Sequence, residues 1–245
     1  MPEIYYYYPM RISLSLLVLV FLMTAATHAQ TVQQNSGWLL LLNNTKISTK
    51  WGTYLDVQLR TADNWGSVRN LLFRPGITYY VNGKNELTFG YLLNQTYTHT
   101  DELQDNVLTE HRMWEQYVYR HKAAATVIAQ HRFRVEQRFI ERAGKDHLFA
   151  QRFRYLARFI IPLEKGAKNF EKGYFVALQN ELFFNIQHKN ELNHKLFDQN
   201  RAYIAGGYRV NKHLDLEAGY LNQAIKGLNN NTINSVVQLA LYTKF

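Results

Sequence analysis

The sequence has no cysteine among its 245 residues, and only four prolines and thirteen glycines. The lack of cysteine excludes a disulfide scaffold and any zinc or iron–sulfur site built on thiolates. The scarcity of proline and glycine argues against a collagen-like or disordered chain, as do seventeen tyrosines and fourteen phenylalanines. Only one long apolar run is present, which excludes a polytopic helical membrane protein. The sequence is instead rich in aromatic residues and carries a formal net charge of +9.

The single apolar run covers residues 12–23 and directly follows Arg11. Thr27-His28-Ala29 then places small residues at positions −3 and −1 of a cleavage site before Gln30. A short basic region, an apolar stretch and a small-residue exit are typical of a secretory signal peptide. The run is shorter than the roughly 20 residues that a spanning helix needs, so we prefer this interpretation to an N-terminal membrane anchor.

The export signal divides the chain in two. We expect residues 1–29 to be a signal peptide and residues 30–245 to form one domain, in which we find no linker and no fixed-period repeat. An acidic residue and four tyrosines precede the basic region if translation starts at Met1. A start at Met10 gives a compact signal peptide, so we favour Met10 as the initiator.

Apolar and polar residues alternate with a period of two through most of the remaining chain. Over residues 86–97, the odd positions are mainly apolar or aromatic and the even positions mainly polar. Over residues 148–161, mainly aromatic odd positions likewise alternate with Arg152, Arg154 and Arg158. A strand sorts such residues onto two faces, whereas a helix would spread them around its circumference.

About eleven segments follow this pattern, and turn signals such as Asn82-Gly83-Lys84 and Ala143-Gly144-Lys145 separate many of them. They lie near residues 38–47, 52–61, 68–81, 85–98, 109–120, 125–141, 148–163, 173–188, 197–210, 213–225 and 234–245. Bacterial single-chain barrels have an even number of strands, so we expect this count to be one strand off. The prediction is an all-β fold, a transmembrane antiparallel up-and-down β-barrel of about twelve strands, with ten as the alternative.

The predicted strands are long enough to cross a membrane, because a spanning strand needs about 9–11 residues. We therefore expect the aromatic face to contact lipid, the polar face to line the lumen, and the protein to lie in the outer membrane. Val237, Leu239 and Leu241 alternate toward Phe245. An aromatic residue at the end of such a strand resembles the signal read by the barrel assembly machinery, so Phe245 is the predicted assembly signal. A secreted or periplasmic β-sandwich is the competing fold.

Three stretches carry a family resemblance: Glu110–Gln116, His131–Arg138, and Phe197–Arg201 followed by Gly206-Gly207-Tyr208. They resemble the domain of unknown function 2490 family, whose members are regarded as outer-membrane barrels. The resemblance implies the barrel architecture over nearly all of residues 30–245. It implies no particular activity.

Charged residues are concentrated on the face assigned to the lumen. The arginines of this face are Arg60, Arg74, Arg112, Arg132, Arg134, Arg138, Arg152, Arg154, Arg158, Arg201 and Arg209, and the acids are Asp56, Glu86, Glu110, Glu136, Glu181, Asp215 and Glu217. We expect a lumenal charge network of Arg132, Arg134, Glu136, Arg138, Arg152, Arg154, Arg158, Glu110, Arg112, Glu181 and Arg201. A hairpin around Gly144 that pairs Arg138 with Arg152 would set Glu136 opposite Arg154.

This charged lumen has two interpretations. The favoured one is a salt-bridged plug in a narrow barrel, because guanidinium groups suit paired carboxylates and small barrels fill their interiors with side chains. The protein would then have a structural or envelope-associated role. The alternative is a positive lumen that selects anions or small solutes, as basic rings do in anion pores.

Enzyme and nucleic-acid functions have less support. A lipid hydrolase of the outer membrane would need a serine–histidine pair near the rim, but no Gly-x-Ser-x-Gly elbow and no His-x-Ser pair occurs. We expect no cofactor or metal, since no metal-binding or phosphate-loop motif is found. The expected partners are outer-membrane lipid, the assembly machinery and lipopolysaccharide phosphates, whereas export argues against nucleic acid.

Overall fold

The computed structural model describes residues 31–98, 106–124, 126–164 and 170–245, and most of them are in β-strands. The expected signal peptide, residues 1–29, lies outside the described residues. Each of the eleven segments that alternate with a period of two coincides with a strand. The strands are β1 (Thr31–Lys46), β2 (Trp51–Ala62), β3 (Ser67–Tyr80), β4 (Asn85–Thr98), β5 (Asn106–Lys122), β6 (Ile128–Arg142), β7 (Lys145–Pro162), β8 (Gly173–Asn185), β9 (Phe197–Asn211), β10 (Leu214–Lys226) and β11 (Asn231–Lys244).

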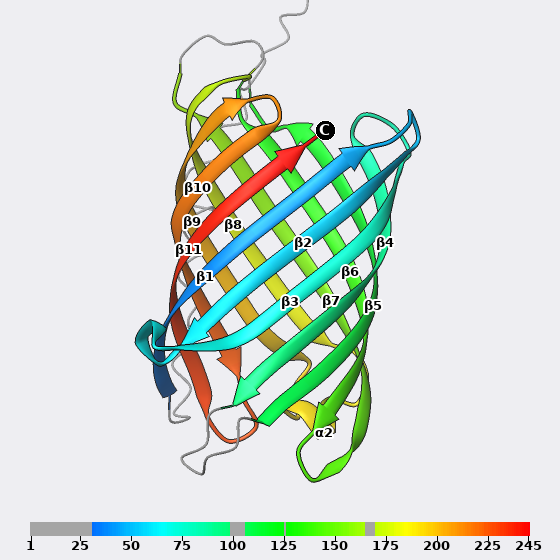
Figure 1. Cartoon of the computed structure of the whole chain (residues 1–245), viewed down its shortest axis with the longest axis vertical. Coiled ribbons are helices and arrows are strands. Elements are labelled where there is room, and N and C mark those ends of the chain that lie inside the picture. The colour runs from blue at the N-terminus through cyan, green and yellow to red at the C-terminus, as the bar shows by residue number, and fades with distance from the viewer. Residues whose placement is uncertain (1–30, 99–105, 125, 165–169) are drawn as a thin grey trace, which may run out of the picture.

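The strands form one closed barrel in which each pairs with its neighbours in the chain (Figure 1). Every consecutive pair is antiparallel, but β1 closes the barrel by pairing with β11 in parallel, from Thr31 opposite Asn231 to Asn44 opposite Lys244. The expected count of twelve strands, or ten, is therefore wrong for the described residues, and so is the expectation of purely antiparallel pairing. Directions alternate along the chain, so the first and last of eleven strands must run the same way.

The two ends of the barrel differ in their connections. We call the end where β1 and β11 finish, at Lys46 and Lys244, the upper end, as it is in Figure 1. The short helix α2 (Lys189–Leu192) lies at the lower end, in the β8–β9 connection, and a 3₁₀ turn (Asp63–Trp65) joins β2 to β3 there. Among the described residues, no helix is long and apolar enough to cross a membrane.

The two faces of the barrel wall have opposite chemistry. On β4, for example, Glu86, Thr88 and Asn94 are buried inside the barrel, whereas Leu87 and Phe89 are exposed on its outside. This is the arrangement that the period of two predicts, because successive side chains of a strand point to opposite faces. A barrel also leaves no free sheet edge, unlike the β-sandwich considered from the sequence.

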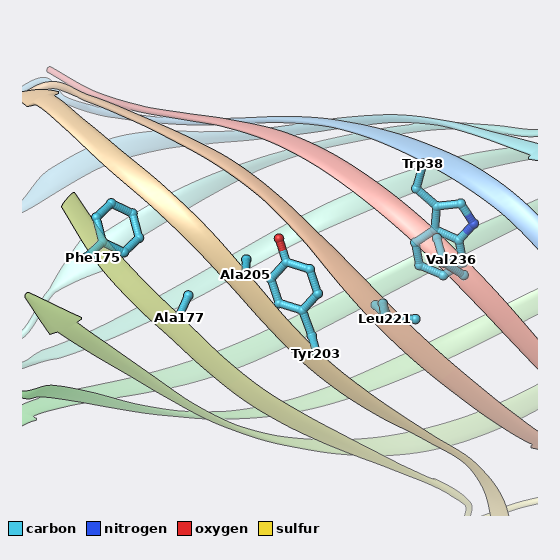
Figure 2. Close-up of a cluster of buried hydrophobic side chains, with 7 residues drawn as sticks. All are labelled: Trp38, Phe175, Ala177, Tyr203, Ala205, Leu221 and Val236. Carbon is cyan, nitrogen blue, oxygen red and sulfur yellow. The ribbon is translucent and has the colours of Figure 1, made fainter. Parts of the chain in front are cut away.

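Apolar side chains occupy two parts of the interior. The larger cluster comes from the consecutive strands β8, β9, β10, β11 and β1, and Figure 2 shows Trp38 beside Val236 within it. Its buried members are Trp38, Phe175, Ala177, Tyr203, Ala205, Leu221 and Val236. The other cluster lies on β2 to β5 and contains Tyr54, Leu72, Leu92 and Trp114. Aromatic side chains of both clusters thus line the interior beside its charged residues.

Glycine allows Trp114 to approach the wall closely inside the barrel. The indole of Trp114 lies so near the wall that a Cβ atom on Gly90 would be 2.3 Å from its ring and 2.5 Å from the carbonyl oxygen of Pro75. Gly76 makes a similar, looser contact with the same ring. The two glycines let a fully buried tryptophan lie flat against neighbouring strands.

Candidate functional site: the charged lumen

A continuous network of ion pairs joins the inner faces of five neighbouring strands, and we call it the lumenal charge network. It consists of Glu110, Arg112, Arg132, Arg134, Glu136, Arg138, Arg152, Arg154, Glu181 and Asp198. Strands β5 to β9 supply these side chains, and all except Asp198 come from positions of inward parity. Nine of the eleven residues expected from the sequence are brought together here. Asp198 was not expected.

Glu136 is the centre of the network. Its Oε2 atom lies 2.7 Å from Nη2 of Arg152 and its Oε1 atom 2.6 Å from Nη1 of Arg154. Arg112 and Arg134 approach the same carboxylate at 3.6 and 4.0 Å. Glu136 is 1% exposed, so all four contacts form away from bulk solvent. One buried carboxylate therefore serves four guanidinium groups.

Two further carboxylates extend the network to neighbouring strands. Glu181 lies 2.7 Å from Arg154 and 2.6 Å from Arg132, both measured from its Oε1 atom to a guanidinium Nη2. Glu110 accepts hydrogen bonds of 2.7 Å from Nε and Nη2 of Arg112. Such paired, charge-assisted bonds hold both groups in a fixed orientation.

Arg138 and Asp198 end the network toward the lower rim of the barrel. Nε of Arg138 donates to Glu110 at 2.6 Å, and Nη1 of Arg152 donates to Asp198 at 3.1 Å. Asp198 does not have the inward parity of β9, whose buried residues Gln199, Tyr203 and Ala205 are odd-numbered. It lies at a register shift between β8 and β9, which a period of two does not predict.

Buried aromatic rings form cation–π contacts with the guanidinium groups. Phe183 is fully buried, and the Cζ atoms of Arg154, Arg201 and Arg152 lie 4.4, 4.6 and 5.1 Å from its ring centroid. Arg134 stacks 4.5 Å from the centroid of Trp114. Cations over aromatic faces gain electrostatic attraction, and desolvation strengthens it. These rings were not recognised as part of the network from the sequence.

The β6–β7 hairpin has a different register from the expected one. Arg138 lies opposite Ala150, and Arg152 lies opposite Glu136, so pairing Arg138 with Arg152 is wrong. The reason is a two-residue turn at Ala143-Gly144 with a register shift beside Ile140, which moves the strands by two positions. The observed register places two like charges, Arg134 and Arg154, opposite each other. The carboxylate of Glu136 contacts both guanidinium groups.

Separate ion pairs occupy the upper half of the lumen. Arg74 contacts Asp56, and Arg158 contacts Glu217. Arg209 donates to both oxygens of Asp215 at 2.7 Å. Arg120, absent from the expected set, lies 2.6 Å from Glu86. Arg158 was expected in the charge network but belongs to this upper set.

Arg60 and Arg201 differ from all of these arginines. Within the described part of the chain, neither has a carboxylate oxygen within 4 Å. Both guanidinium groups lie over the indole of Trp38, at 3.8 Å for Arg60 and 5.1 Å for Arg201. Nε and Nη2 of Arg60 donate to Gln58, whereas Nε of Arg201 is buried without a hydrogen-bond partner.

A cavity of about 300 Å³ lies beside these two arginines and extends to the upper end. Arg120 and Lys244 line it there, and their side chains are 40% and 56% exposed. Arg132, Arg154 and Glu181 of the charge network line its floor, and Arg134 and Glu136 beyond them are each 1% exposed. The interior therefore has an accessible upper chamber bounded by the charge network.

Three histidines of the barrel form hydrogen bonds outside the charge network. His111 and His131 bond to the hydroxyl groups of Tyr91 and Tyr155 on the outer face, and His213 contacts the carbonyl oxygen of Lys244. Over the described ranges, no group of three His, Asp or Glu residues is arranged to hold a metal ion. The chemistry that the interior offers is ionic and hydrogen-bonding recognition.

Comparison with known families gives one match. The family model described as Protein of unknown function (DUF2490) matches residues 35–234. The chain belongs to this family. The resemblance drawn from residues 110–116, 131–138 and 197–208 is thereby confirmed. No curated protein and no solved structure matches the chain.

The match places the whole charged interior within the DUF2490 domain. It begins in β1 and ends in β11, so it covers β2 to β10 completely and includes every residue of the lumenal charge network. The barrel is therefore the structure of the family domain itself.

Proposed function

We propose that this DUF2490 chain is a β-barrel of the outer membrane whose lumen is closed to ion flow by its charge network. The observation that carries the proposal is the polarity of the wall, with apolar side chains outside and charged side chains inside. A barrel in water gains free energy by burying apolar surface and solvating charge. Only a surrounding of lipid favours the opposite arrangement.

The outer face is apolar along the middle of the strands. Phe73, Phe89, Ile204 and Leu239 are about half exposed, on β3, β4, β9 and β11, and similar residues occur on the strands between. Soluble monomers rarely expose contiguous apolar surface on this scale. An apolar band that continues from strand to strand is what lipid contact requires.

Aromatic pairs mark the upper end of this band. The rings of Trp51 and Tyr79 lie 5.0 Å apart, and those of Tyr174 and Tyr208 lie 4.8 Å apart. All four residues lie near the upper ends of their strands. Tyrosine and tryptophan are favoured where hydrocarbon meets water, because one part of each ring system is apolar and another is polar.

Closure of the lumen follows from the charge network. Its guanidinium groups are held by Glu110, Glu136 and Glu181, and buried rings fill the space around them. An ion crossing the lower half would have to break several of these bonds and leave buried charges without partners. Such a loss is costly in a low-dielectric interior, so we expect little conductance.

Cell fractionation tests the location. Full-length protein expressed in a Gram-negative host should sediment with the outer membrane. Its electrophoretic mobility should change on heating, because a closed barrel resists detergent at low temperature. Recovery as a soluble periplasmic protein would refute the proposal.

Planar-bilayer recording tests closure. The unmutated protein should give little current, whereas a variant combining Glu136→Ala and Arg152→Ala should conduct, since it removes the centre of the network. The matched control combines Arg142→Ala and Glu191→Ala, an ion pair whose side chains are 27% and 48% exposed. It should behave like the unmutated protein. Steady anion-selective current through the unmutated barrel would favour the pore function instead.

A further inference from the structure

The upper chamber carries more positive than negative charge. Nine arginine or lysine side chains and five carboxylates line the cavity of about 300 Å³. Seven of the nine basic side chains have a carboxylate oxygen within 4.0 Å. The exceptions are Arg60 and Arg201. Arg60 and Arg201 are therefore the two cations of this lining that lack a nearby carboxylate.

These two residues share one aromatic ring. Arg60 reaches Trp38 from β2 and Arg201 reaches it from β9, and Trp38 itself lies on β1 between them in the barrel. An aromatic face attracts a guanidinium group but bonds to none of its N–H donors, which project in the plane of the group. Stacking thus fixes both groups in place and leaves donors available.

The donors of Arg201 are the least satisfied. No hydrogen bond is formed by its Nε atom, which is buried, and Arg60 directs two of its nitrogens at the single acceptor Gln58 Oε1. A buried donor without an acceptor costs free energy, and two neighbouring cations repel each other. An anion between Arg60 and Arg201 would relieve both costs.

We propose that the upper chamber binds a small solute or headgroup bearing an oxyanion, phosphate or carboxylate, with Arg60 and Arg201 as its charge contacts. Planar guanidinium groups bind such oxyanions through two parallel N–H···O bonds. The volume suits a ligand at the small end of those that protein cavities hold. Arg120 and Lys244 line the mouth of the chamber, where they are paired with Glu86 and Asp215.

This site goes beyond the proposed function, because binding depends on the interior of the barrel and not on its location. Calorimetric titration of the full-length protein with sodium pyrophosphate, in a non-ionic detergent at low salt, provides the test. Arg60→Gln and Arg201→Gln should each weaken binding by about tenfold or more, the loss expected for one charge-assisted contact. Arg69→Gln makes the same change of charge at an exposed arginine away from the cavity and should leave affinity unchanged.

A second titration distinguishes a free solute from a lipid phosphate. The same variants are titrated with phosphatidic acid in mixed micelles. If the unmutated protein binds pyrophosphate and both lumenal variants lose this binding, the result supports a free oxyanion solute as the ligand. Binding of phosphatidic acid alone, with the same dependence on Arg60 and Arg201, supports the site with a lipid phosphate as ligand.

The proposal is overturned if neither compound binds, or if all variants bind equally well. Each variant should keep the heat-dependent gel mobility of the folded barrel, since it removes an unpaired buried cation. A variant that loses this mobility is replaced by Arg→Lys at the same position, which keeps the charge but not the paired donors. Its affinity should also fall, and an unchanged affinity would contradict the proposal.

Discussion

Arg154 Nη1 lies 2.6 Å from Glu136 Oε1, and both side chains are almost completely removed from solvent. The same guanidinium group contacts Glu181 at 2.7 Å, so it joins carboxylates from β6 and β8. Buried pairs of this kind contribute to stability only while both partners are present. Several expected outcomes depend on this property of the interior.

Glu136→Gln should lower the free energy of unfolding by about 3–5 kcal/mol, because it leaves Arg152 and Arg154 charged and buried without their main partner. Urea unfolding in detergent, followed by tryptophan fluorescence, measures the change. The control Glu191→Gln removes a carboxylate that is 48% exposed and should cost at most about 1 kcal/mol. Similar losses in the two variants would mean that the lumen is wet.

Gly90→Ala should destabilise the barrel by about 1–3 kcal/mol, because the added Cβ atom would overlap both Trp114 and the backbone of Pro75. Thermal unfolding in detergent tests this. Gly206→Ala is the matched control, since a Cβ atom there meets nothing within 4 Å. If both variants unfold at the temperature of the unmutated protein, the close contact of Trp114 with the wall is wrong.

Two changes at Phe245 distinguish a role of its ring in assembly from the role of its backbone in strand pairing. Its backbone N–H donates to Asn44 at 2.9 Å and its carbonyl accepts from Lys46 at 2.6 Å, while its ring stacks on His213. Deletion removes both backbone bonds and should cost about 1–3 kcal/mol. Phe245→Ala keeps them.

If the aromatic ring is a signal for assembly, both changes should reduce the folded outer-membrane fraction at equal synthesis, as quantified by unheated gels of membrane fractions. If Phe245→Ala assembles normally and only the deletion fails, the ring has no such role.

Export should remove residues 1–29. Mass spectrometry of protein from the membrane fraction should find Gln30, free or cyclised, at the N-terminus, because Thr27-His28-Ala29 provides the small residues that signal peptidase needs. Ala29→Arg should block processing and leave the longer chain. Recovery of protein that still begins at Met1 or Met10 would contradict the cleavage site.

The strands could be predicted from the sequence because alternation is a local property. On β7, Arg152, Arg154 and Arg158 lie inside as their parity indicates, because successive side chains of a strand point to opposite faces. The strand number failed for a different reason. Twelve was inferred from the even-number rule for bacterial barrels, whereas the parallel contact of β1 with β11 closes the barrel at eleven.

The contacts inside the barrel depend on information that alternation does not contain. The register of β6 against β7 is set by the turn at Ala143-Gly144, and an error of two positions preserves parity while changing every partner. Arg60 lies directly opposite Trp38 in the hairpin of β1 and β2, whereas Arg201 comes from the distant strand β9. Parity could place all three residues inside, but only the closed barrel brings Arg201 to the other two.

If the charge network closes the lumen, as proposed, the upper chamber opens at one end of the barrel alone. A solute that enters the upper chamber must leave the way it came, so the site exchanges with a single compartment and comes to equilibrium with it alone. Occupancy would then record the concentration on that side, whatever the other side contains. Such a barrel can sense or store a ligand without moving it across.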